Sequence, residues 1–130
     1  MNLLLLLSAC LLFRRDRKDE LDLALDAADA VFAQRADAQK LDEAIGAYVL
    51  INATWPAEGR VLMRLSRSFA ARAETLGPED QRKELELARG YGLECLANNP
   101  GFSSRWNLAG GRVTPEAVRQ LTATDAPCIA

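Results

Sequence analysis

The chain has 130 residues, of which 49% are apolar and 26% charged, and its formal net charge is −2. This composition is typical of a single soluble domain, and its abundant alanine, leucine, glutamate and arginine favour α-helix. The weak negative charge argues against a nucleic-acid partner, because such binding needs a basic surface that displaces phosphate counterions. The sequence contains no histidine, so every catalytic or metal-binding scheme that needs imidazole is excluded.

The first ten residues, MNLLLLLSAC, form an apolar run that ends in Leu-Ser-Ala-Cys. This ending resembles the lipobox of bacterial lipoproteins, and the resemblance implies cleavage before Cys10, acylation of Cys10 and a membrane tether. The run has no positive charge before Cys10 and four basic residues after it, within residues 14–18, which is not the order of a secretory signal. A lightly anchored or buried apolar N-terminus is therefore the alternative, since the run is too short to span a bilayer.

Residues 16–20, DRKDE, are predicted to be a solvated tether, with helix beginning at Leu21. Apolar residues recur three and four apart from Leu21 to Phe32, which is the spacing of one helix face. A turn at residues 35–37 leads to a second helix, in which Ala44 and Tyr48 belong to the apolar face. Asn52, Thr54 and Pro56 are expected to end it. These two helices are therefore predicted to form an antiparallel pair.

A second helix pair is predicted directly after the first. One helix runs from Glu58 to Glu74, and the next from about Glu79 to Ala97. Gly77 and Pro78 separate them, and we expect Gly77 in the left-handed conformation that follows many helices. Thr114 is expected to cap a further short helix, which extends through Leu121.

The two pairs share a spacing. Ala44, Tyr48 and Pro56 recur at the same offsets as Ala88, Gly92 and Pro100, and Trp106 starts a WNLAG segment that matches the W-x-x-L-G opening of a tetratricopeptide repeat with alanine in the leucine place. These seven residues are predicted to be repeat-packing positions. The stretch between Phe69 and Ala88 is longer than a 34-residue repeat permits, so the repeats are degenerate.

The predicted fold is all-α, with antiparallel helix pairs stacked as a short tetratricopeptide-like solenoid. A signal-like segment and charged tether occupy residues 1–20, and a helical-repeat domain occupies residues 21–130. Its pairs lie at about 21–56 and 57–100, and a third begins at about 102–130.

The three cysteines, Cys10, Cys95 and Cys128, lack metal-ligand spacing. Cys95 falls on a buried helix stripe, where a small core residue is the favoured interpretation. The alternative is a reactive thiol, and a disulfide between Cys95 and Cys128 is also left open.

No catalytic constellation is visible, so we expect neither an enzyme nor a cofactor or metal site. The carboxylates show no spacing that singles out an acid/base pair. Trp106 is expected to pack in the core, whereas Trp55, at a helix end, is an equal candidate for contact with a ligand or partner.

Several segments together resemble the T-component family of tripartite ATP-independent periplasmic (TRAP) transporters. They are residues 7–10, 30–48, 90–102 with Trp106, and 123–128. The resemblance implies a periplasmic, membrane-tethered helical-repeat lipoprotein whose partner is a solute-binding protein and whose cargo is a small, partly hydrophobic organic ligand. Family members continue with further helix pairs, so the chain is expected to be an N-terminal fragment. The alternative is a generic tetratricopeptide-like adaptor, cytoplasmic or membrane-associated, without a transport role.

Overall fold

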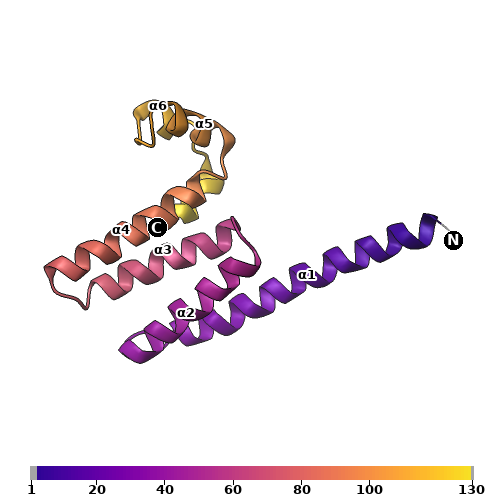
Figure 1. Ribbon diagram of the computed structural model, residues 1–130, viewed down its shortest axis with the longest axis horizontal. Helices are drawn as coiled ribbons and strands as arrows, with labels where there is room; N and C mark the ends of the chain where they lie inside the picture. The colour runs from indigo at the N-terminus through magenta and orange to yellow at the C-terminus, as the bar shows by residue number, and fades with distance from the viewer. Residues whose placement is uncertain (1–2, 130) are drawn as a thin grey trace.

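A computed structural model describes the backbone of residues 3–129 and the side chains of residues 17–129. Within that range every regular element is helical (Figure 1), which confirms the all-α prediction. In chain order the elements are α1 (Leu3–Phe32), α2 (Ala38–Thr54), α3 (Gly59–Ala73), α4 (Pro78–Leu96), α5 (Pro100–Leu108), α6 (Pro115–Val118) and a 3₁₀ helix, η1 (Ala123–Cys128).

Side chains at the helix starts explain where several helices begin. The carboxylates of Asp37 and Glu58 accept hydrogen bonds from backbone N–H groups in the first turns of α2 and α3. Asn99 and Thr114 do the same for α5 and α6, and proline follows each of them. The predicted cap at Thr114 is confirmed, although α6 ends at Val118 and is shorter than expected.

Consecutive helices pack against one another: α1 on α2, α2 on α3, and α3 on α4. Figure 1 shows α3 and α4 as an antiparallel pair and α2 running back along the C-terminal half of α1, whose N-terminal part extends away from the other helices. The short helices α5 and α6 follow the end of α4, and η1 returns to contact α3 and α4.

The core lies mainly between α1, α2 and α3, and α4 adds Ala88 to it. Tyr48 and Ala44 are fully buried at its centre, and the Tyr48 ring lies 6.3 Å from that of Phe32. The other buried members are Leu21, Leu25, Ala28, Leu41, Ile45, Ile51, Val61, Leu65, Phe69 and Ala88. Helical periodicity therefore identified the core correctly.

The prediction that helix begins at Leu21 is wrong, because α1 is continuous from Leu3. Residues 16–20, expected to be a tether, form part of this helix. From Leu3 to Phe32 the sequence contains neither glycine nor proline, and leucine, arginine, lysine and glutamate are strong helix formers, so no residue interrupts the helix.

Two expectations about glycines and repeats also fail. Gly77 has a φ of −70° and is the N-cap of α4, not a left-handed residue. Trp106 lies near the end of α5 and not at the start of a repeat helix. Gly110 and Gly111, with φ of 65° and 80°, follow that end, and this left-handed backbone prevents the helix from continuing. The helix that carries Trp106 therefore ends two residues after it, at Leu108.

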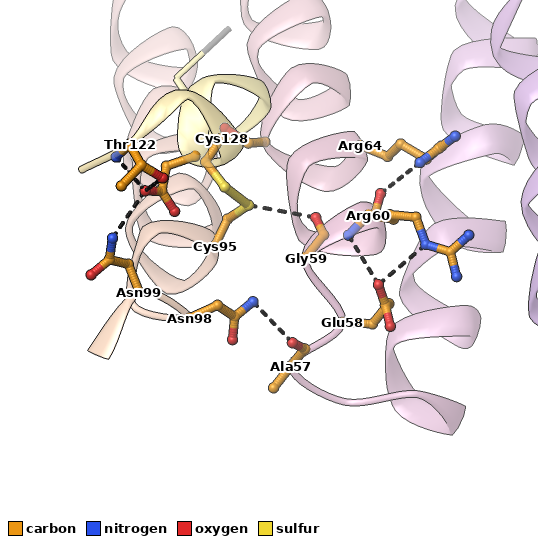
Figure 2. Close-up of a disulfide and its surroundings, with 12 residues drawn as sticks. Ala57, Glu58, Gly59, Arg60, Arg64, Cys95, Asn98, Asn99, Thr122 and Cys128 are labelled. Carbon is orange, nitrogen blue, oxygen red and sulfur yellow. Dashed lines mark hydrogen bonds and ion pairs between the residues drawn. A yellow bond between two sulfur atoms is a disulfide. The ribbon is translucent and has the colours of Figure 1, made fainter. Parts of the chain in front are cut away.

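A disulfide between Cys95 and Cys128 attaches η1 to α4 (Figure 2). Cys95 is buried, as predicted, but the favoured expectation of an unbonded core cysteine is wrong. Asn99 supports the same attachment, because its Nδ2 donates hydrogen bonds to the Gln120 carbonyl at 2.8 Å and to Asp125 at 3.0 Å. The disulfide thus holds η1 to α4, and the Asn99 side chain adds two hydrogen bonds beside it.

Candidate functional site

A polar cluster joins the three core helices at one edge of the core. The Tyr48 hydroxyl on α2 donates to Asp29 on α1 at 2.6 Å. From α3, Arg64 donates to both oxygens of the same carboxylate, at 2.8 and 2.9 Å. The guanidinium and carboxylate thus form a bidentate pair, the geometry that gives such pairs their strength.

The contacts within this cluster shift the pKa values of Asp29 and Tyr48. Burial alone would raise the pKa of Asp29, but the hydrogen bonds from Arg64 and Tyr48 outweigh it and hold the pKa below the ordinary 3.8. Burial and the bond to Asp29 both raise the pKa of Tyr48, which therefore stays protonated. The charges of Asp29 and Arg64 are satisfied by each other.

Beside this cluster lies an open cavity of about 470 Å³, which we call the arginine groove. It runs between the C-terminal end of α1, the turn that follows, and α3. Its lining residues are Asp29, Phe32, Ala33, Arg35, Arg67, Ala70, Ala71 and Glu74. A second cavity of about 430 Å³ shares four of these residues and extends the groove to Ala36, Leu41 and Thr75.

Local sequence positions each side of the groove. Arg67, Ala70 and Ala71 on α3 and its C-cap residue Glu74 have the spacing of one helix face. On the opposite side, the backbone N–H of Arg35 donates to the Phe32 carbonyl at 3.0 Å, so the turn after α1 brings the Arg35 side chain back toward the Phe32 ring.

The guanidinium groups of Arg35 and Arg67 lie over the same aromatic ring. The central carbon of each is 4.7 Å from the centroid of Phe32, which is within the range of a cation–π contact. Among residues 17–129 neither arginine forms an ion pair with a carboxylate. Asp29, the nearest acidic group of the cluster, is already bound by Arg64 and Tyr48. The groove therefore presents two arginines without a close ion pair, and the carboxylates of Asp29 and Glu74 line it with them.

The structure places most of the predicted repeat-packing residues away from the groove. Ala44, Tyr48 and Ala88 are buried in the core. A β-carbon added at Gly92 would lie 3.3 Å from the Ser66 hydroxyl, so this small residue permits close packing of α4 on α3. Pro56 and Pro100 are exposed beside helix ends.

The two tryptophans line other cavities. Trp55 is half-buried against the core and lines a cavity of about 330 Å³ with Arg17, Lys18 and Arg60. Trp106 stacks on Phe102 at 6.2 Å and lines a different cavity of about 330 Å³. Its indole nitrogen has no partner within the described part of the chain and is shielded from solvent. Contact of Trp55 with a ligand stays a prediction.

Sequence reasoning missed Arg35 and Arg67 as residues of a candidate site. The spacing of Arg67, Ala70, Ala71 and Glu74 on one helix face was visible. The position of Arg35 opposite these residues could not be seen in the sequence, because it depends on how α1 packs on α3. The side chain of Cys10, the predicted lipid attachment site, lies outside the described side chains.

Comparison of the chain with known proteins gives no match to a protein-family model, a curated protein or a solved structure. No helix in residues 3–129 combines the length and the apolar character needed to cross a membrane. The side chains of residues 17–129 include no cluster of three or more cysteine and acidic groups arranged to hold a metal ion.

Proposed function

We propose that this chain is a non-enzymatic helical binding protein that holds a small organic ligand in the arginine groove. The observation that carries this proposal is the groove itself. It is an open cavity beside the three-helix core, and it combines three alanines and Phe32 with four charged side chains, Asp29, Arg35, Arg67 and Glu74. Binding sites commonly combine apolar walls with a few placed polar groups.

The resemblance to the T component of a TRAP transport system extends this proposal. On that basis the protein is a periplasmic lipoprotein, tethered through Cys10, whose partner is a solute-binding protein. The Cys95–Cys128 disulfide supports an exported location, because disulfides persist in oxidising compartments and are rare in the cytosol. The stacked order α1, α2, α3 and α4 suits a tetratricopeptide-like scaffold.

A thermal-shift panel tests the binding function. Wild-type protein and an Ala71→Trp variant, in which the indole fills the groove, are heated with hexanoate, hexylammonium or hexan-1-ol. At least one compound is expected to raise the melting temperature of the wild type, because a ligand that binds only the folded state stabilises it. The variant is expected to show no shift.

An Ala53→Trp variant is the matched control, since Ala53 is exposed on α2 and does not line the groove. It should respond as the wild type does. If none of the three compounds shifts the wild type, or if Ala71→Trp responds equally, the groove is not a ligand site and the proposed function fails.

The membrane tether has its own test. Intact mass and membrane fractionation are compared for the wild type and a Cys10→Ala variant expressed in a bacterial host. We expect the wild type to lose residues 1–9, gain acyl mass and sediment with membranes, and the variant to do none of these. If both stay soluble and unprocessed, the lipoprotein assignment is wrong and an intracellular adaptor becomes the better account.

A further inference from the structure

We infer that the Trp106 cavity is a second ligand site, which takes a small neutral molecule carrying a primary carboxamide. This cavity of about 330 Å³ lies where the ends of α2 and α4 meet α3 and α5. It shares no lining residue with the arginine groove, so the inference goes beyond the proposed function and does not rest on it.

Two side chains that line the cavity each carry a polar atom without a hydrogen-bond partner. The atoms are Oδ1 of Asn52, on α2, and Nε1 of Trp106, on α5, and both are buried. Among the side chains of residues 17–129, the Ser68 hydroxyl is the one other buried polar atom without a partner. Folded proteins pair nearly all such atoms, because an unpaired one keeps the cost of leaving water. Two of them at one cavity indicate a place where a hydrogen-bonding group binds.

The backbone beside the cavity is strained. Ala57 lines the cavity, and its φ of 61° is the one positive φ outside glycine in the described backbone. An alanine is rarely found in this left-handed conformation, because its β-carbon crowds the backbone. The Asn98 side chain, which also lines the cavity, holds the conformation by donating to the Ala57 carbonyl at 3.2 Å (Figure 2). Strain of this kind is concentrated at ligand sites, so the backbone supports the same location independently.

The two unpartnered atoms define the chemistry of the ligand. The indole N–H of Trp106 only donates, so its partner must accept, and Oδ1 of Asn52 only accepts, so its partner must donate. A carboxylate or a ketone offers acceptors alone, and an ammonium group offers donors alone. A primary carboxamide carries its acceptor and its donor on two separate atoms. It can therefore pair with two side chains that come from different helices.

Binding requires a rearrangement of the Trp106 side chain. Both unpartnered atoms are closed to solvent in this structure, although their residues line the cavity. Trp106 lies in the last turn of α5, and rotation of its side chain brings the indole N–H to the carboxamide oxygen. Pro56 and Ala97, neither of which is buried, line the same cavity and offer apolar surface to a short alkyl chain.

Indole NMR signals test the inference. The chain has two tryptophans, so nitrogen-15 labelling gives two indole N–H signals, which Trp55→Phe and Trp106→Phe assign. The probes are butyramide, pentan-2-one, in which a methyl group replaces the amide nitrogen, and butyrate. We expect butyramide to shift the Trp106 signal until it saturates and to leave the Trp55 signal in place. Pentan-2-one and butyrate should bind about tenfold more weakly, because neither donates to Asn52.

An Asn52→Leu variant tests the second hydrogen bond. Leucine has nearly the shape of asparagine but no acceptor, so butyramide should bind this variant no more tightly than pentan-2-one does. Asn107→Leu is the matched control, since Asn107 is exposed on α5 and does not line the cavity, and it should bind butyramide as the wild type does. The comparison of the three probes needs only the wild type, so it decides the matter even if a variant fails to fold.

Several results would overturn the inference. One is a Trp106 signal that butyramide leaves unmoved, and a magnetisation transfer from water to that indole proton would then show that ordered water satisfies it. Another is equal binding of butyramide and either of the other probes to the wild type. A third is equal weakening of butyramide binding in Asn52→Leu and Asn107→Leu. None of these results bears on the thermal-shift test of the arginine groove, so the two sites stand or fall separately.

Discussion

Replacing Asp29 with alanine is expected to lower the free energy of unfolding by about 2 kcal/mol. The change removes the acceptor for the Tyr48 hydroxyl and for both hydrogen bonds from Arg64. Arg64 is left partly buried with an unpaired charge, since its side chain is only 19% exposed. Breaking a fully buried pair costs more than this, but solvent reaches part of Asp29 and reduces the cost. Urea denaturation followed by circular dichroism measures the change.

Asp42→Ala is the matched control. Asp42 also pairs with an arginine, Arg72, but its side chain is 63% exposed, and exposed ion pairs contribute about 0–1 kcal/mol. Tyr48→Phe should cost about 1 kcal/mol, because it removes one hydrogen bond and leaves the Asp29–Arg64 pair. If Asp29→Ala is no more destabilising than Asp42→Ala, the three-helix cluster does not hold the core as described.

The same cluster predicts acid sensitivity. The folded-state pKa of Asp29 lies below its ordinary value of 3.8, so its contribution to stability is complete above that value and is lost as the pH falls through the folded-state pKa. The pKa of Asp125 is also lowered, by hydrogen bonds from Thr122 and Asn99. Wild-type stability should therefore fall between about pH 5 and pH 2, and Asp29→Ala should lose less over the same interval. Equal losses of stability in the wild type and in Asp29→Ala would show that Asp29 does not cause the acid sensitivity.

Removing the disulfide is expected to have an effect of similar or larger size. A Cys128→Ala variant should lose about 3 kcal/mol, since Cys95 and Cys128 close a long loop across a sequence separation of 33. The unfolded chain then gains conformational freedom, and η1 loses its covalent attachment to α4. Denaturant unfolding of the oxidised protein gives the difference.

Reductant provides the control for that variant. Adding dithiothreitol should destabilise the wild type by a similar amount and leave Cys128→Ala unchanged. Thiol alkylation in denaturant, read by intact mass, should modify neither Cys95 nor Cys128 unless the protein is reduced first. Alkylation of both without reduction would show that the disulfide is not formed and would remove its support for an exported location.

The helices of the core could be predicted from sequence because their signals are local. The apolar stripes of α2, α3 and α4 recur at helical spacing, and residues such as Thr114 cap helices through contacts a few positions away. The start of α1 was missed because a mixed-charge segment is compatible with both a linker and an exposed helix. The prediction that Trp106 lies at the start of a repeat helix was wrong, because a short motif does not determine whether it lies near the start or the end of its helix.

The arginine groove could not be predicted from sequence, because it depends on tertiary packing. Arg35 belongs to a turn and Arg67 to α3, and in the sequence neither differs from an ordinary surface arginine. Only the packing of both beside Phe32 brings their charges together. In the same way, the contacts of Asp29 with Arg64 and Tyr48 join three helices and depend on tertiary packing.

A methyl NMR titration tests the central claim most directly. In protein labelled at its alanine methyl groups, the signals of Ala33, Ala70 and Ala71 report on the groove, and that of Ala97 reports on the Trp106 cavity. On addition of the compound that raises the melting temperature of the wild type most, we predict shifts for the three groove signals and none for Ala97. Unmoved groove signals, or a response confined to Ala97, would contradict the account that the arginine groove is where this protein binds its ligand.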